Sequence, residues 1–511
     1  MDSTSYFSSA AALFSGCASR LPFRSKTRLA LRGFTVLGFL WFALAMPALA
    51  QSWNLSWSDE FNGAANSAID SANWTYDTGV LNVNNEIEYY CAPGSNTAPC
   101  VSGTPNAYID GSGHLIIQAI KINSSVAPNS GSWTSARLKS QNLQSFQYGR
   151  LESSMKLPIG AGIWPAYWAL GSNIDSVGWP NSGEIDFMEN VPASAGQGPT
   201  VISSTIHGGN SSSDCYCGGN GLGHQFDFPA NQDVTSFHTY GGIWSTNMVQ
   251  FYVDDPKNIF FVRTASDLPS NFTWDFNHPF FLLLNLAIGG TGSWPGPPDS
   301  NTPNPALMSV DYVRRYTPGA VAGPTMSAPA INVTAGQIGQ TTLNLNSTSG
   351  TGRVYLTCST NAPKASCSLS TGDALDEFTV DFSSASSGTT AIRVATTANT
   401  SARLDSPRHG LQNLRLQSVE FLAAAFGLFG FVLYPTKWNL RVRRSLGGAG
   451  LMLILLVHPG CGGSGGQTGG GGGGRDNGTS PGNYTVTVNA YTLSNTTGNA
   501  DSTATIALTV N

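Results

Sequence analysis

The sequence has few charged side chains. Asp, Glu, Lys and Arg make up 11% of the 511 residues, whereas a typical globular chain has about a quarter. The formal net charge is −5, and no basic stripe follows the first fifty residues. Proteins that bind nucleic acid present clustered Lys and Arg to the phosphates, so the composition argues against nucleic acid as a partner.

Residues 53–316 also lack any convincing helical pattern longer than a turn or two. Short apolar runs are instead separated by Gly, Pro, Asn and Ser, which is the pattern of strands and turns. Examples of such runs are 114–120, 148–157, 250–253 and 280–286. Many short strands predict an all-β sandwich. A region of about 265 residues is large for an immunoglobulin-type sandwich but suits a jelly roll with long loops on one face.

The first fifty residues have the features of a targeting segment. Five Arg and Lys residues between positions 20 and 32 precede an apolar run over 33–46, and Ala48-Leu49-Ala50 stands before Gln51. This order predicts a signal peptide over 1–50, with an uncleaved anchor as the alternative. In either case the rest of the chain crosses a membrane, so we expect a secreted, extracellular protein.

Cysteine spacing fits an exported chain. The close pairs are Cys91 with Cys100, Cys215 with Cys217, and Cys358 with Cys367. Export permits disulfides, and the first and third pairs could each close a short loop or hairpin. The middle pair has no matching His or Cys cluster, so we interpret it as a loop staple rather than a metal site.

The most informative stretch is 182–190, which places three carboxylates within six residues. On an extended strand Glu184 and Asp186 share one face, while Ile185 and Phe187 share the other. Strict alternation would turn Glu189 away from the other two acids. One extra residue in a β-bulge would return Glu189 to the acidic face, and bulges are frequent beside active sites.

Three acids on one face of a mostly apolar strand suggest chemistry. A retaining glycosidase needs two carboxyl groups about 5 to 5.5 Å apart, one as nucleophile and one as acid and then base. Clustered like charges should also separate the pKa values of the group. A solvated edge strand with scattered acids is the alternative interpretation of such a motif.

Aromatic side chains surround the acidic stretch. Trp164, Tyr167, Trp168 and Trp179 precede it, and Trp244 and Trp294 lie further along the chain. Indole and phenol rings stack on sugar rings while their polar edges bond hydroxyl groups. The sandwich core is the alternative place for any one of them, but tryptophans so close to the acidic strand favour a sugar-binding cleft.

These residues resemble glycoside hydrolase family 16, and most closely its bacterial laminarinase-like β-1,3-glucanase branch. The resemblance rests on the segments 57–63, 85–86, 135–138, 148–152, 162–171, 183–190 and 285–290 and on His207. It implies a concanavalin-like β-jelly-roll that cleaves internal β-linkages with retention. Family members such as lichenases lack the extra residue of the acidic motif, so the bulged spacing leans toward laminarinase, agarase or carrageenase types.

The resemblance also implies roles for particular residues. By motif position Glu184 would be the nucleophile, Glu189 the acid/base and Asp186 the assisting carboxylate. Positions where the family contacts sugar or braces the acids are Asn85, Arg137, Trp164, Trp168 and His207. The chemistry needs no cofactor, but many members bind a structural Ca²⁺, for which Asp311 is the matching position and a surface Asp the alternative.

The chain after residue 318 has a different composition, rich in Ala, Ser, Thr, Gly and Val. Alternating runs over 319–404 and 481–511 resemble the two parts of a bacterial immunoglobulin-like domain. The insertion between them, 405–480, has two apolar runs with four cations between them, followed by a Gly-rich linker. Its segment 419–458 would suit a membrane hairpin, with a buried or interfacial helical pair as the alternative.

The sequence therefore predicts a catalytic domain over 51–318 that hydrolyses β-1,3-glucan of the laminarin type or mixed-linkage β-glucan. We expect a monomer whose partner is the polysaccharide. One alternative is a hydrolase of agarose or carrageenan on the same scaffold, because loops rather than the acids select the sugar. Another is a jelly roll that binds glycan without cutting it, and a third is a transglycosylase that remodels cell walls.

Overall fold

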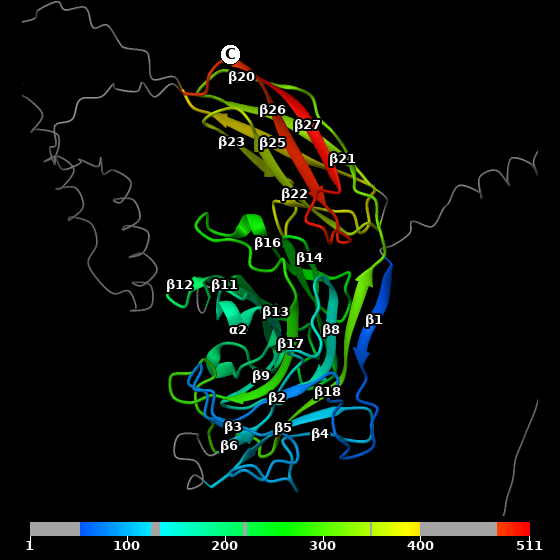
Figure 1. Ribbon diagram of the computed structural model, residues 1–511, viewed down its shortest axis with the longest axis vertical. Helices are drawn as coiled ribbons and strands as arrows, with labels where there is room; N and C mark the ends of the chain where they lie inside the picture. Colours follow the sequence, from blue (N-terminus) through cyan, green and yellow to red (C-terminus); the bar gives the residue numbers. More distant parts are fainter. Residues whose placement is uncertain (1–51, 124–132, 218–221, 348–349, 399–477) are drawn as a thin grey trace, which may run out of the picture.

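The computed structural model describes residues 52–123, 133–217, 222–347, 350–398 and 478–511 (Figure 1). The predictions for 1–50 and for 419–458 lie outside these ranges. Within them the protein is almost entirely β-structure, and the longest helix is the four-residue α2 (Ile174–Val177). No helix in these ranges has the length and hydropathy needed to cross a bilayer.

The N-terminal domain is a jelly roll of two packed sheets, which confirms the predicted fold class. In the order of their pairing the strands of the ten-stranded sheet are β16 (Ile259–Thr264), β15 (Met248–Val253), β14 (His238–Ser245), β8 (Gly149–Lys156), β18 (Ala306–Pro318), β5 (Leu115–Lys121), β6 (Trp133–Ser135) and β3 (Glu88–Tyr90), with β1 (Trp53–Asp59) on β18 and β4 (Ala107–Ile109) on β5. The predicted runs 114–120 and 148–157 thus match β5 and β8 to within one residue at each end.

The eight-stranded sheet lies against it and carries the acidic motif. Its strands are β12 (Asp214–Tyr216), β11 (Val201–Ser211), β10 (Glu184–Glu189), β9 (Ile163–Gly171), β17 (Phe280–Ile288), β7 (Arg137–Lys139) and β2 (Thr75–Asp77), with β13 (Leu222–Asp227) on the far side of β11. Short 3₁₀ turns stand at η2 (Ala193–Ala195), η3 (Gly198–Thr200) and η5 (Ala265–Asp267).

Apolar side chains of the two sheets meet in one large core. On β10, Ile185 and Phe187 point into it, with 0% and 1% of their surface exposed. The Phe187 ring lies 4.9 Å from that of Tyr167 on β9 and 6.4 Å from that of Phe251 on β15 in the other sheet. Because alternate side chains of a strand face opposite ways, this packing turns the neighbouring acids to the outer face of the sheet.

A second, smaller sandwich follows. One sheet contains β19 (Thr325–Ser327), β21 (Ile338–Asn346), β25 (Ser387–Thr396) and β23 (Ala365–Ser370), and the other contains β20 (Ile331–Val333), β27 (Ser502–Val510), β26 (Gly482–Tyr491), β22 (Arg353–Thr360) and β24 (Thr379–Asp381). Strands β26 and β27 pair with β22 and β20, so the segments on either side of the insertion form one domain. Its immunoglobulin-like class stays a prediction.

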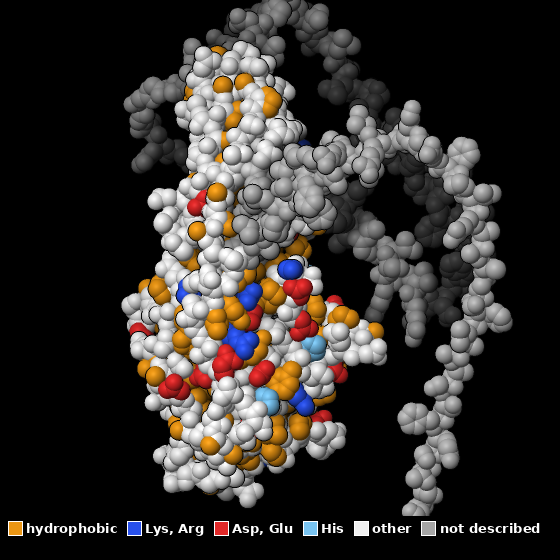
Figure 2. All heavy atoms as spheres, turned by 90° about the vertical axis from the view of Figure 1, so that its right-hand side faces the viewer, with side chains coloured by type: hydrophobic (Ala, Val, Ile, Leu, Met, Phe, Trp, Pro, Cys, Tyr) orange, Lys and Arg blue, Asp and Glu red, His pale blue; other side chains and the backbone are white. Residues whose placement is uncertain are grey.

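The two domains differ in surface character. On the face in Figure 2 charged side chains gather over the lower, jelly-roll domain, and few lie on the upper sandwich. The cysteines pair as Cys91–Cys100, Cys215–Cys217 and Cys358–Cys367, which confirms the predicted short loops and the staple. The first two pairs lie in the jelly roll and the third pins β22 to β23 in the sandwich.

Candidate active site

Strand β10 contains the predicted bulge. Against β11, Glu184 lies opposite His207 and Asp186 opposite Thr205, but the register then shifts before Glu189. The same shift appears against β9, between Asp186 and Met188. Met188 is fully buried. The additional residue turns Met188 into the core and returns Glu189 to the face of the other two acids, as the sequence predicted.

Asp186, at the middle of the trio, is paired with a histidine. It is 2% exposed, and His207 Nε2 lies 3.0 Å from Asp186 Oδ2. One ligating atom from each of Glu184, Asp186 and His207 lies within 4.8 Å of the others. Such a set could hold a metal ion by its chemistry. However, Glu184 already accepts a hydrogen bond from Trp179, and Asp186 is already in contact with His207. We therefore interpret the group as a cluster that shares protons.

Each glutamate of the trio accepts a hydrogen bond from one indole. Trp179 Nε1–H donates to Glu184 Oε2 at 2.8 Å, and Trp164 Nε1–H donates to Glu189 Oε1 at 3.0 Å. The Trp164 ring meets the edge of Trp294, with centroids 5.7 Å apart. Trp179 and Trp294 are 43% and 42% exposed. Two exposed indoles therefore border the acids and offer flat faces to a ligand.

Burial is the main influence on the titration of the trio. It raises the pKa of Glu184 to about 8, and the charge of Asp186 adds to this, while His207 and the Trp179 hydrogen bond act against it. Burial raises the pKa of Glu189 to about 7, with His207 and Trp164 opposing. The pKa of Asp186 is also raised by burial. Burial thus raises all three pKa values, and those of Glu184 and Glu189 lie near neutral pH, which suits acid/base chemistry.

An aromatic and basic group lies beside the acids on β9, β17 and β7. Trp168 faces the same side as Asp186, and its Nε1–H donates to Asn285 Oδ1 at 2.7 Å. The Arg137 guanidinium lies over the Trp168 ring, 4.6 Å from its centroid, and its Nε is 3.0 Å from Asp77 Oδ2. Arg137 thus holds the indole in place and is itself fixed by a carboxylate.

The structure brings most of the predicted site residues together. Trp164, Trp168, His207 and Arg137 lie around the trio on adjacent strands. Asn85 instead lies on an exposed loop, where its side chain donates to the Gly292 carbonyl at 3.3 Å. It therefore braces the loop that carries Trp294. Contact of any of these residues with sugar stays a prediction.

Asp311 lies on β18, at a register shift between Val310 and Tyr312. The one group of three or more acidic, His or Cys side chains close enough to share a metal ion in the described residues is the group of Glu184, Asp186 and His207. Asp311 does not belong to that group, and Ca²⁺ at this position stays a prediction.

Sequence reasoning missed two contacts of the site. Trp179 was grouped with the aromatic residues, without its role as the donor to Glu184. Asn285 was part of a motif but was not proposed for the site, although it is the one amide in the apolar run of β17. A polar residue inside a fully buried strand usually has a partner, and that signal could have identified it.

Paired glutamates beside indoles on the outer face of a jelly roll define the class, a β-sandwich glycoside hydrolase. The family model for glycosyl hydrolases family 16 matches residues 95–314. A beta-glucanase of Rhodothermus marinus is 34% identical over 52% of this chain and 86% of its own length. The chain belongs to glycosyl hydrolase family 16.

Two further similarities show how much of the chain is matched. The glucan endo-1,3-beta-glucosidase A1 of Niallia circulans is 33% identical over 53% of this chain, and the match spans only 38% of that protein. The solved endo-beta-1,3-glucanase of Pyrococcus furiosus is 37% identical over 53% of this chain and 96% of its own, with a TM-score of 0.45. The matched half of the chain contains the jelly roll.

Proposed function

We propose that this protein hydrolyses internal β-1,3-linkages of a β-glucan with retention of configuration. The observation that carries the proposal is the bulged strand β10, which presents Glu184 and Glu189 on one face, each bonded to an indole N–H. Two carboxyl groups that flank the scissile glycosidic bond are the machinery of a retaining glycosidase. The names of the relatives reported above support β-glucan as the substrate.

In the first step Glu189 gives its proton to the glycosidic oxygen as Glu184 attacks the anomeric carbon. The bond to the leaving sugar breaks, and a glycosyl ester forms on Glu184. Water then attacks the same carbon, Glu189 takes its proton, and Glu184 leaves as a carboxylate. A pKa near 7 suits Glu189 because this group must be protonated in one step and ionised in the next.

Asp186 and His207 balance the negative charge of the two glutamates during these steps. Asp186 is buried between the two glutamates and in contact with His207. A proton shared within this pair lets Glu184 ionise without placing three adjacent negative charges in a buried site. The Trp179 N–H, which can only donate, stabilises the ionised form of Glu184.

The test is the release of reducing ends from laminarin, lichenan, agarose and carrageenan by the full chain. Activity should appear on laminarin, and Glu184→Gln should lower it by several orders of magnitude because the nucleophile is lost. NMR of the first products should show the β-anomer if configuration is retained. A folded wild type that cuts none of the four polymers would contradict the proposal. First products in the α-form would show that configuration is not retained.

We also propose that the protein is exported, and that the second sandwich and the apolar segment 419–458 are accessory to the catalytic domain. The targeting pattern over 1–50 and the three disulfides support export, because disulfides persist in oxidising compartments. Fractionation of cells that express the full chain, with and without 419–458, tests a membrane tether. A chain recovered only from the cytosol would contradict export.

A further inference from the structure

His207 contacts the catalytic trio through one ring nitrogen. Its Nε2 lies 3.0 Å from Asp186 Oδ2, whereas its Nδ1 is buried and has no hydrogen-bond partner among the described residues. A histidine that works beside a carboxylate is commonly oriented by a second hydrogen bond at its other nitrogen. Because His207 lacks that bond, the position of its imidazole depends on the backbone that carries it.

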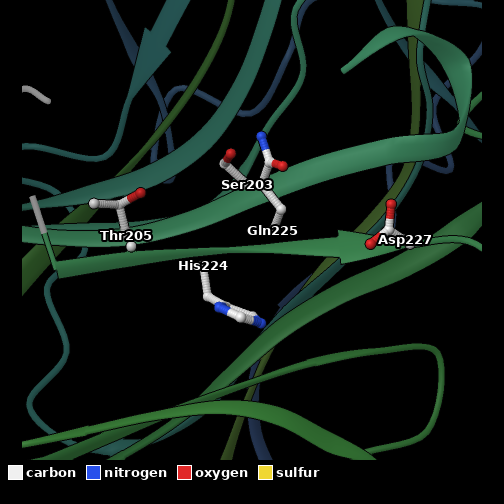
Figure 3. Close-up of a pocket in the computed structure, with 6 residues that line it drawn as sticks. Ser203, Thr205, His224, Gln225 and Asp227 are labelled. Carbon is white, nitrogen blue, oxygen red and sulfur yellow. The ribbon is translucent and has the colours of Figure 1, made fainter. Parts of the chain in front are cut away.

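The backbone of β11 changes its partners at His207. In the described residues, β13 pairs with β11 only as far as Ile206, and β10 pairs with it only as far as His207, which lies opposite Glu184. From Gly208 onward the paired strand is β12. Figure 3 shows the part of β11 before this point, with Ser203 and Thr205 on β11 and His224, Gln225 and Asp227 on the neighbouring β13. His207 therefore lies where the long pairings of β11 end.

Two glycines follow His207. Gly209 has a φ of +138°, which residues with a side chain rarely adopt, and the register against β12 shifts between Gly209 and Ser211. Glycine loses more conformational freedom on folding than any other residue, so a glycine pair is costly to hold in one conformation. A contact from outside the strand is needed to fix this segment, if His207 is to stay against Asp186.

Asp275, on the loop before β17, supplies that contact. Its Oδ2 accepts hydrogen bonds from the backbone N–H of Gly209 at 3.1 Å and from the hydroxyl of Tyr216 at 2.9 Å. Tyr216 is 3% exposed and lies opposite Gly208 on β12. A Cβ at Gly208 would come within 2.7 Å of the same carboxylate oxygen, so only glycine allows this approach. One oxygen atom thus joins β11 to β12 directly after His207.

The loop that carries Asp275 is anchored to the core. The next residue, Phe276, is fully buried, and its carbonyl accepts a hydrogen bond from Trp244 Nε1–H at 2.9 Å. The loop also packs against the start of β10, because a Cβ at Gly183 would come within 2.8 Å of the Asp275 carbonyl oxygen. Asp275 therefore stands on a fixed backbone that touches the residue before Glu184, while its side chain holds the segment after His207.

We propose that Asp275 is a positioning residue for catalysis, which holds His207 against Asp186 through its hydrogen bonds to Gly209 and Tyr216. This inference rests on the proposed function, in which Asp186 and His207 balance the charge of the two glutamates. Loss of the Asp275 carboxylate would displace the imidazole and leave the indoles of the cleft in place. The chemical steps should therefore be impaired, and the binding of glucan should not.

The test measures kcat and KM on laminarin with the full chain. Asp275→Ala removes both hydrogen bonds and should lower kcat about ten- to hundredfold, which is the effect of displacing a catalytic group by about 1 Å. KM should stay within about twofold of the wild type. Asp275→Asn should keep kcat within about threefold of the wild type, because its amide oxygen can accept both hydrogen bonds.

Two further variants separate positioning from folding. Tyr216→Phe retains the buried ring and removes one of the two hydrogen bonds, so kcat should fall by about threefold. Asp255→Ala is the control, since Asp255 also accepts a hydrogen bond from a backbone N–H, that of Lys257, but does so in the turn after β15. The control should change neither kcat nor KM. Thermal unfolding of each variant gives the folded fraction to which kcat is referred.

A double-mutant cycle tests the route through His207. His207→Gln should lower kcat by itself, and Asp275→Ala added to it should cost less than about twofold more, because the two residues act as a unit. Losses that multiply in the double variant would overturn the positioning role. An unchanged kcat in Asp275→Ala or in Tyr216→Phe, or an Asp275→Asn variant as slow as Asp275→Ala, would overturn it as well. A folded wild type inactive on laminarin would instead refute the proposed function.

Discussion

The two glutamates on β10 differ from ordinary surface acids in being partly buried and in each having a single indole donor. Burial destabilises a carboxylate because it removes water, whereas a hydrogen bond from a donor-only group stabilises it. The indoles of Trp179 and Trp164 therefore lower pKa values that burial has raised. At this scale the protonation of the site depends on two N–H groups whose rings also border the cleft.

Removal of either donor should move the pH optimum of kcat/KM upward. In Trp164→Phe the pKa of Glu189 rises from about 7, and in Trp179→Phe that of Glu184 rises from about 8, because each carboxylate loses a favourable contact. One hydrogen bond of about 1 kcal/mol corresponds to roughly 0.7 pKa units. The midpoint of a bell-shaped profile is the mean of its two pKa values, so the optimum should rise by roughly 0.3 to 0.5 units.

Trp168→Phe is the matched control for this prediction. Its indole donates to the neutral amide of Asn285, not to an acid of the trio. This variant should not share the shift: its pH optimum is expected to stay at the wild-type value even if its activity falls. Full pH profiles of kcat/KM for the three variants decide the matter, and an unchanged or lower optimum in Trp164→Phe and Trp179→Phe would contradict the assigned roles.

At the scale of the element, β10 serves the core and the site together. Phe187 fills the space between the sheets, and a Cβ at Gly242 on β14 would come within 2.6 Å of its ring. We expect Phe187→Ala to lower the free energy of unfolding by about 3 to 5 kcal/mol, because it leaves a large cavity that the surroundings cannot close. Denaturant unfolding measures the loss.

Phe187→Leu is the graded control for that prediction, since it retains much of the buried volume and should cost clearly less. Both variants leave the acids in place, so any loss of activity at temperatures where the variants stay folded would report a shift of β10. A loss of stability below 1 kcal/mol in Phe187→Ala would mean that the core does not hold the strand as described.

The bulge on β10 was predictable because it follows from local parity. Three acids meant for one face need an additional residue when their spacing is E-x-D-x-x-E, and no distant contact enters that argument. The hydrogen bond from Trp168 to Asn285 was not predictable in this way. The two residues are 117 apart in the sequence, and they meet only through the pairing of β9 with β17, which long-range contacts decide. The Trp179 contact is local, since it joins residues five apart, but no motif marks it.

At the scale of the whole molecule, the two domains share a buried interface. Residues Ile243, Met248, Tyr252 and Val262 of the jelly roll form one apolar cluster with Tyr355 and Leu493 of the second sandwich. Thr246 Oγ1 donates to the Asn495 carbonyl at 3.1 Å, and the hydroxyls of Ser266 and Tyr355 are 2.8 Å apart. Strands β14 to β16 thus have the core on one face and the sandwich on the other, so the domains should move as one body.

A carboxyl pair crosses this interface. Asp376 of the sandwich is 7% exposed and lies near Asp267 of the jelly roll; its Oδ1 accepts from the backbone N–H of Phe378 at 2.7 Å, and its Oδ2 is buried without a hydrogen-bond partner. Two carboxyl groups close together in a buried interface repel each other when both are ionised, so one of them favours its protonated form. Burial first, and then the charge of Asp267, raises the pKa of Asp376 to about 7. The nearby cation of Arg263 and the phenol of Tyr355 are the other ionisable groups that face the pair.

The sign of the pH dependence follows from this raised pKa. The unfolded Asp376 ionises near pH 4 and the folded one near pH 7, so the folded state retains a proton that the unfolded state loses. The stability that the pair contributes is complete below pH 4, falls as the pH rises to 7, and is absent above that.

Asp376→Asn removes this dependence, since the amide can donate to Asp267 at any pH. We expect a gain of about 2 kcal/mol at pH 8 and little change at pH 4. Thermal unfolding of the full chain at both pH values measures it, with Asp255→Asn, an exposed acid of the jelly roll, as the control. A variant no more stable than the wild type at pH 8 would show that ionisation of Asp376 does not destabilise the folded state.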